Sequence, residues 1–199
     1  GLDQPRYFMM RELPFGNDGN FSHTAMVNRM NSDLANDFGN LAQRVLSMIN
    51  KNCDGMVPTP GLLTVDDSAL LVPARELLVT MREHIDVQAI HHSLAALWDV
   101  VGEANRYVDS QAPWALKKTD PERMATVLYV LAEVIRHLAI LAQPVVPEAA
   151  GKMLDQLAIA EDQRSFAALA EDGMLRPDTP LPKPQGVFPR YAGAEEADA

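Results

Sequence analysis

A long apolar stripe between His23 and Asn52 is the feature that most constrains the fold of this chain. Its apolar residues recur at alternating steps of three and four, at Val27, Met30, Leu34, Phe38, Leu41, Val45 and Met48. This spacing places them on one face of an α-helix, because each turn takes 3.6 residues. The stripe predicts a long helix with one core-facing side, and Ser22 is its expected N-cap.

Other segments carry the same helical period, and none shows sustained alternation with a period of two. The further expected helices cover about residues 3–12, 66–84, 86–108, 120–143, 147–157 and 163–170. Asp86 and Asp120 are expected to begin two of them, and Pro73 is expected to kink a third or to mark its later start. The chain is therefore predicted to be all-α, a bundle of four long helices with shorter C-terminal helices.

Proline dominates the sequence after Met174. The stretch RPDTPLPKPQGVFPR contains five prolines, which favour an extended backbone and exclude a regular helix. We expect this segment to form a strap that lies along a surface.

Charge and cysteine content exclude several classes of protein. A formal net charge of -10 argues against nonspecific coating of nucleic acid, which needs a broad basic surface. With Cys53 as the single cysteine, neither an intrachain disulfide nor a four-cysteine zinc site can form, and a reducing compartment, most simply the cytoplasm, fits best. No apolar run approaches the roughly 18 to 20 residues that cross a bilayer, so no membrane partner is expected.

Motifs for metal binding and catalysis are missing from the sequence. His91 and His92 are adjacent and diverge on a helix, and the other histidines have no carboxylate at ligand spacing. A nucleophile elbow and a glycine-rich phosphate loop are also absent. We therefore predict no metal site and no catalytic residue.

Three polar residues on the striped helix share a face that points away from the core. Asn36, Asn40 and Arg44 are spaced i, i+4, i+8. Amide and guanidinium groups are the forked donors and acceptors that read base edges in single-stranded nucleic acid. On spacing alone, an ordinary solvated helix face is the more common explanation.

The stretch QAPWALKKTDPE, residues 111–122, places a tryptophan between two long helices. Pro113 rules out a continuous helix there, so Trp114 sits at a bend, and Lys117 and Lys118 follow within a turn. An exposed ring beside positive charge can stack an unpaired base and hold its phosphate. A tryptophan between helices more often plugs the end of a core, which is where Trp98 is expected.

Two irregular stretches, NSDLANDFGNLAQRVLSMINKNCDG and GEANRYVDSQAPWALKK, resemble the C-terminal half of methionyl-tRNA synthetase. The resemblance implies a helical domain that recognises the CAU anticodon, with a tryptophan stacked on the first anticodon base. The matching positions are Trp114 with Pro113 for stacking, and Asn40 and Arg44 for base recognition. Asn36 is a third, less secure candidate, and Lys117 and Lys118 are expected to contact backbone phosphate. The implied partner is the anticodon loop of methionine tRNA.

The resemblance also implies that the chain is the C-terminal part of an ATP-dependent methionine-tRNA ligase. ATP with magnesium would be the cofactor of that parent enzyme, and this chain by itself is expected to hold none. The family's His-Ile-Gly-His and Lys-Met-Ser-Lys-Ser signatures do not occur here, so the chain alone is expected to be inactive.

The same resemblance predicts four parts in the chain. Residues 1–21 would be a connector helix and loop from the missing catalytic domain, and residues 22–173 the helical anticodon-binding domain. Residues 174–190 would be the extended strap, and residues 191–199 a disordered acidic tail. We expect the connector helix and the strap to dock on the missing domain. Without it, both should be mobile or held by crystal or self contacts, with Tyr7, Phe8, Met9 and Met10 exposed.

Two alternatives stay open at this point. The Asn/Arg face and Trp114 could grip a partner chain, which would make this a helical protein-protein interaction module. The chain could also be the equivalent domain of another class I aminoacyl-tRNA synthetase. Binding of anticodon stem-loops distinguishes these alternatives.

Overall fold

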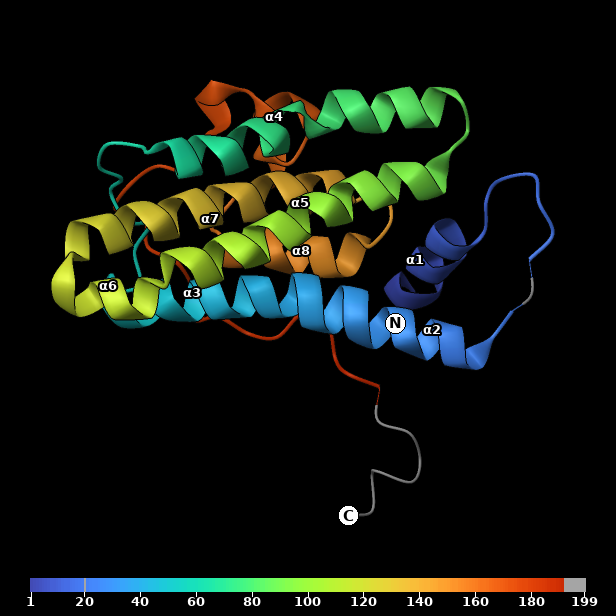
Figure 1. The fold of residues 1–199 in the computed structure, drawn as a ribbon, viewed down its shortest axis with the longest axis horizontal. Coiled ribbons are helices and arrows are strands. Elements are labelled where there is room, and N and C mark those ends of the chain that lie inside the picture. Colours follow the sequence, from blue (N-terminus) through green and yellow to red (C-terminus); the bar gives the residue numbers. More distant parts are fainter. Residues whose placement is uncertain (20, 192–199) are drawn as a thin grey trace, which may run out of the picture.

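The computed structural model describes residues 1–19 and 21–191, and within them the chain is all-α, as predicted (Figure 1). Most of the predicted acidic tail, residues 192–199, lies outside the described residues. The helices, in chain order, are α1 (Asp3–Glu12), α2 (His23–Arg29), the π-helix η1 (Met30–Gly39), α3 (Asn40–Asn52), α4 (Val65–Asp86), α5 (Ile90–Gln111), α6 (Pro113–Thr119), α7 (Pro121–Ala142) and α8 (Pro147–Gln156). Because α2, η1 and α3 follow one another directly, the predicted bundle of four long helices is confirmed.

The apolar stripe of the first long helix faces the core. Its central residues are buried, namely Leu34, Phe38, Leu41 and Val45. The predicted cap is also present, since the Ser22 Oγ accepts a hydrogen bond from the Ala25 N–H at 3.2 Å. Burial of this face holds the long helix against the rest of the bundle.

The middle of this helix is wider than an α-helix. The Asn40 N–H donates to the Ala35 carbonyl, five residues earlier, which is the hydrogen bond of a π-helix. The apolar spacing predicted a regular α-helix and missed this turn. Since Asn36 lies inside η1, its direction relative to Asn40 does not follow from α-helical spacing.

Helix α7 forms the centre of the bundle. Asp120 caps it, as predicted, through a 3.0 Å hydrogen bond from the Arg123 N–H. An 18-residue window of α7 has a mean hydropathy of 1.7, long and apolar enough to cross a membrane, but 94% of that window is buried inside the protein. Glu133 and Arg136 interrupt the apolar run inside this window, and the two charges pair in the interior at 2.6 Å.

The boundaries of α4 and α5 differ from those predicted. Thr64, and not Asp66 or Asp67, caps α4, with Asp67 completing a capping box. The helix continues through Pro73, which lies on the solvent side, where water can satisfy the carbonyl that loses its donor. Asp86 ends α4 instead of beginning α5.

The predicted helix over residues 163–170 is wrong. The chain forms three short 3-10 turns there, at Glu161–Gln163, Phe166–Leu169 and Glu171–Gly173. Two backbone carbonyls in this stretch are taken by side chains of the preceding segments: Arg136 donates to the Ala168 carbonyl at 2.6 Å, and Gln143 to the Arg164 carbonyl at 2.7 Å. A helix over 163–170 would have paired the Arg164 carbonyl with the Ala168 N–H, which donates to the Ser165 carbonyl instead.

Helix α1 packs on the bundle, so of the two expected outcomes it is contacts within the chain that hold it. Tyr7 and Phe8 are buried, so they are not the exposed apolar residues that we expected, whereas Met9 is 51% exposed. The Asp3 carboxylate accepts the Ala149 N–H at 2.7 Å at the start of α8. This contact places a negative charge at a helix N-terminus, which stabilises both helices.

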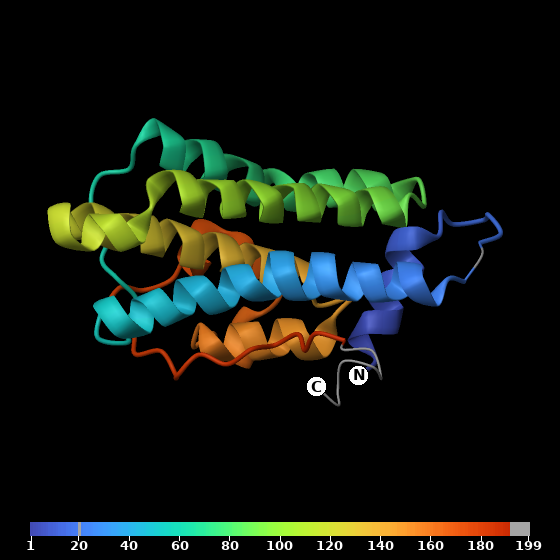
Figure 2. The ribbon, with the colours of Figure 1, turned by 60° about the horizontal axis from the view of Figure 1, so that its bottom comes forward.

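The proline-rich strap is extended, as predicted, and contacts within the chain hold it on the bundle too. Figure 2 shows it running beside α8 and the first long helix. Its Gln185 N–H donates to the Gln156 side chain of α8 at 2.7 Å, and Phe188 is buried against Phe38 and Gly39. The division into four parts predicted from the sequence stays a prediction.

Candidate nucleic-acid interface

Trp114 lies at a sharp corner between α5 and α6. Helix α5 ends at Gln111, and Ala112 then adopts a left-handed conformation with φ 44° and ψ 58°. Pro113 is the first residue of α6, and its burial anchors the turn to the bundle. The Trp114 side chain is 52% exposed, which leaves part of the ring available to a ligand.

The amide and guanidinium ridge, formed by Asn36, Asn40 and Arg44, runs from η1 into α3, and Arg44 is its member that contacts the last turns of α5 before this corner. Asn40 and Asn36 are exposed, on α3 and η1, and Arg44 is half-buried one turn after Asn40. Figures 1 and 2 both show α6 and α3 at the end of the molecule opposite α1 and α2. The structure thus places Arg44 beside the end of α5, the helix that leads into the Trp114 corner.

Arg44 connects the ridge to the helix that carries Trp114. Its Nη1 pairs with the Asp109 carboxylate at 3.0 Å, and its Nη2 lies 3.4 Å from the Asn105 side-chain oxygen. Asp109 precedes Trp114 by five residues on the last turns of α5. The Asn105 amide donates in turn to the carbonyls of Asp37 and Val101, at 3.2 and 3.1 Å. The guanidinium is therefore oriented before any ligand arrives.

The strap covers the other side of the ridge. The Arg190 guanidinium donates a hydrogen bond to the Asn36 side-chain oxygen. Between the strap and the helix lies a hollow of about 280 Å³, lined on the helix side by Asn36, Asn40 and Gln43. Sequence reasoning missed Gln43 and Arg190, because the strap's path could not be read from its prolines.

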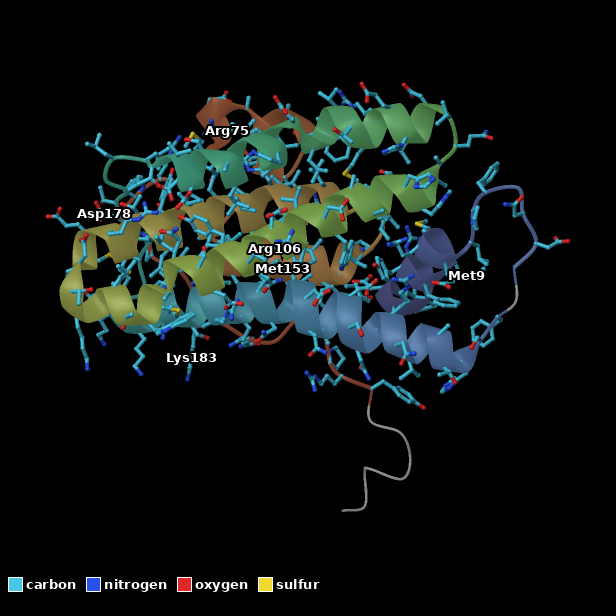
Figure 3. All side chains as sticks on the ribbon, in the orientation of Figure 1. Met9, Arg75, Arg106, Met153, Asp178 and Lys183 are labelled. Carbon is cyan, nitrogen blue, oxygen red and sulfur yellow. The ribbon has the colours of Figure 1, made fainter. Side chains whose placement is uncertain are left out.

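Positive and negative side chains border this surface together. Lys117 and Lys118 are exposed on the last turn of α6, and Lys183 of the strap points away from the bundle in Figure 3. The Asp109 carboxylate, whose side chain is 65% exposed, contributes a negative charge to the same surface. Burial, together with the charge of Asp33, raises the pKa of Asp37. The positive charge is local, as expected for a chain that is acidic overall.

A buried ion pair holds the helix ends beside Trp114. The fully buried Asp67 carboxylate accepts hydrogen bonds from Arg123 at 2.6 and 2.7 Å, and from the Tyr107 hydroxyl. Burial acts to raise the pKa of Asp67, but the bonds from Arg123, the Thr64 backbone and Tyr107 outweigh it and lower this pKa to about 2. Arg123 also donates to the Gln111 side chain at 2.7 Å. Sequence spacing gave no signal for this cluster, whose members lie up to 59 residues apart.

The remaining candidates do not form a second site. Trp98 packs on Tyr7 and Phe38, with ring centroids 4.5 and 6.0 Å away, and its Nε1 donates to the Asp33 carbonyl, so its predicted core position is confirmed. The rings of His91 and His92 lie 4.1 Å apart, close to each other despite the divergence expected on a helix. Within residues 1–19 and 21–191, no group of His, Cys, Asp or Glu is arranged to hold a metal ion.

A helical bundle with an exposed tryptophan at a corner, beside amide and guanidinium groups, has the features of a domain that binds single-stranded RNA. Comparison with known families identifies it further. Residues 57–198 match the family described as the anticodon binding domain of methionyl tRNA ligase, so the chain belongs to that family. Residues 1–46 match the class I tRNA synthetases of the methionine type.

Individual relatives agree with this assignment. The chain is 57% identical over its full length to the methionine–tRNA ligase of Mesorhizobium japonicum, and 54% identical over 98% of its length to that of Mycobacterium leprae. It covers 39% and 37% of those proteins.

Solved structures show the same fold. The free form of Mycobacterium tuberculosis methionyl-tRNA synthetase superposes with a TM-score of 0.93 at 54% identity, covering 96% of this chain and 39% of that one. Its complex with methionyl-adenylate gives a TM-score of 0.92 at 53% identity, over 95% and 38% of the two chains. Hence the chain spans about two fifths of the length of the proteins that it matches.

Proposed function

We propose that this chain reads the CAU anticodon of methionine tRNA. The Trp114 ring would stack on the first anticodon base, and Asn40 and Arg44 would hydrogen-bond to base edges. Asn36 would be a third base contact once Arg190 releases its side-chain oxygen. Lys117 and Lys118 would hold backbone phosphate.

One observation carries this proposal: the Arg44–Asp109 ion pair ties the ridge to the last turns of α5, five residues before the exposed Trp114 ring. An aromatic ring can hold an unpaired base by stacking, while nearby directional hydrogen-bond donors identify the base by its edge. Because Arg44 is already bonded on one side, its remaining donors point in a restricted direction, which favours selectivity.

The chain would carry out this role as part of a longer methionine-tRNA ligase. That enzyme would use ATP with magnesium to activate methionine, in a catalytic part connected through the segment at residues 1–46. Its partners would be methionine tRNA and the catalytic part, and its location the cytoplasm, where Cys53 stays reduced.

Titration with anticodon stem-loops tests the proposal. The wild-type chain should bind a CAU stem-loop more tightly than one in which the first anticodon base alone is U. Since a well-placed bidentate contact discriminates by about 1 to 3 kcal/mol, the ratio should be roughly 5 to 150. The two RNAs carry the same charge, so phosphate contacts cancel in the comparison.

The alternatives give different results in the same titration. A protein-protein interaction module would bind both stem-loops equally or not at all. The equivalent domain of another class I synthetase would prefer a different anticodon, which a panel of stem-loops with single changes at each anticodon position would reveal. Either outcome rejects recognition of CAU.

A further inference from the structure

The corner that carries Trp114 is held in an unfavourable backbone conformation. Ala112 has φ 44° and ψ 58°, a region in which the Cβ of an L residue crowds its own carbonyl. Ala112 also precedes Pro113, a position at which extended backbone is normally preferred. Helix α6 has only seven residues, too few to fix its own direction. Contacts on either side of the corner must therefore hold it.

Gln111, the last residue of α5, is gripped by side chains from two other helices. Its Oε1 accepts from Arg123 Nη2 of α7 at 2.7 Å, and its Nε2 donates to the Asp66 carboxylate of α4 at 3.2 Å. Arg123 is itself bonded to fully buried Asp67 through both of its terminal nitrogens. The guanidinium thus has little freedom, and neither does the end of α5 that it holds.

These contacts flank α6 on both sides. Gln111 comes two residues before Pro113, and Arg123 follows the Asp120 cap that begins α7. A bond between Gln111 and Arg123 consequently closes the loop that contains Trp114, over only twelve residues. Loss of this bond would let the corner relax towards the extended backbone that Pro113 favours.

We infer that Gln111 is a positioning residue that fixes the Trp114 ring for stacking. Arg123 holds Gln111, and Asp67 in turn anchors Arg123. This inference rests on the proposed function. Gln111 acts through the backbone at Ala112 and has no contact with the RNA. The ordered ring would lose less freedom on binding, so stacking would cost less.

The test compares two substitutions in a Trp98→Phe background, in which Trp114 is the single source of tryptophan fluorescence. Gln111→Met keeps the length of the side chain and removes both hydrogen bonds. Gln111→Glu combined with Asp66→Asn exchanges the two groups, so that a carboxylate faces Arg123 and an amide faces the new carboxylate. The double substitution therefore restores both hydrogen bonds of residue 111 with the amide and the carboxylate exchanged.

Two readouts separate positioning from general stability. The first is the decay of Trp114 fluorescence anisotropy without RNA, and the second is the dissociation constant for the CAU stem-loop. Gln111→Met should speed the local decay and weaken binding roughly 3- to 10-fold, with circular dichroism unchanged. The exchanged pair should return both readouts to the values of the Trp98→Phe parent.

The outcomes distinguish this inference from the function on which it rests. If the parent does not prefer CAU, the proposed function fails, whatever Gln111 does. If the parent is selective but Gln111→Met leaves either the decay or the affinity unchanged, the positioning role alone is refuted. Failure of the exchanged pair to restore both readouts also refutes it.

Discussion

Substitution of Trp114 by alanine measures the value of the stacking surface directly. Stacking of a base on an aromatic ring contributes about 1 to 3 kcal/mol, so affinity for the CAU stem-loop should fall roughly 5- to 150-fold. The fold should survive the change. A fully buried tryptophan costs about 3 to 5 kcal/mol on truncation, and since 52% of Trp114 is exposed, we expect about half of this, roughly 2 kcal/mol.

The assay is a fluorescence anisotropy titration with a labelled CAU stem-loop at fixed salt, because phosphate contacts make affinity depend on ionic strength. Urea unfolding followed by circular dichroism reports the stability change. Phe15→Ala is the matched control: Phe15 is 63% exposed and lies in the loop between α1 and α2, at the opposite end of the bundle. Equal losses of affinity in the two variants, or a loss below about twofold in Trp114→Ala, would refute stacking on this ring.

Four further substitutions test the surroundings of the site. Arg44→Ala should weaken binding of the CAU stem-loop and also reduce the ratio of the dissociation constants for the UAU and CAU stem-loops. Lys118→Ala should weaken binding of both stem-loops by the same factor. Parallel titrations measure both effects. Ala112→Gly should relieve the left-handed backbone and leave the unfolding free energy nearly unchanged, yet weaken binding because the corner becomes flexible; a gain in affinity would contradict this. The pKa of Asp67 is lowered to about 2 from an ordinary value of 3.8. Its ionised form therefore contributes about 2 kcal/mol of stability above pH 4, which is lost as the pH falls towards 2. Urea unfolding should consequently show a shallower acid loss in Asp67→Asn than in wild type.

The sequence predicted the helices well where the signal is local. The stripe from Leu34 to Val45 and the caps at Ser22 and Asp120 were all found where expected. Errors arose where distant side chains compete for the backbone. The turns after Glu161 are the clearest case, since Gln143 takes the Arg164 carbonyl, 21 residues away, that a helix would have needed.

Spacing and resemblance together predicted which residues form the site, but they did not predict how these residues contact one another. Spacing placed Asn40 and Arg44 on one face, and the bend before Trp114 was visible from Pro113. The sequence did not show that Asp109 would hold Arg44, that Arg190 would reach Asn36, or that Arg123 would grip Gln111. Each of these contacts joins elements that the chain itself keeps apart.

The sequence by itself determined the long helices and which of their faces are apolar, because helical hydrogen bonds and caps join residues only a few positions apart. Tertiary structure alone decided how the connector helix and the strap pack, and how the corner of Trp114 is held. These outcomes depend on burying shared surface and pairing buried charge such as Asp67 with Arg123. These interactions contribute to stability only when distant parts of the chain come into contact in the folded protein.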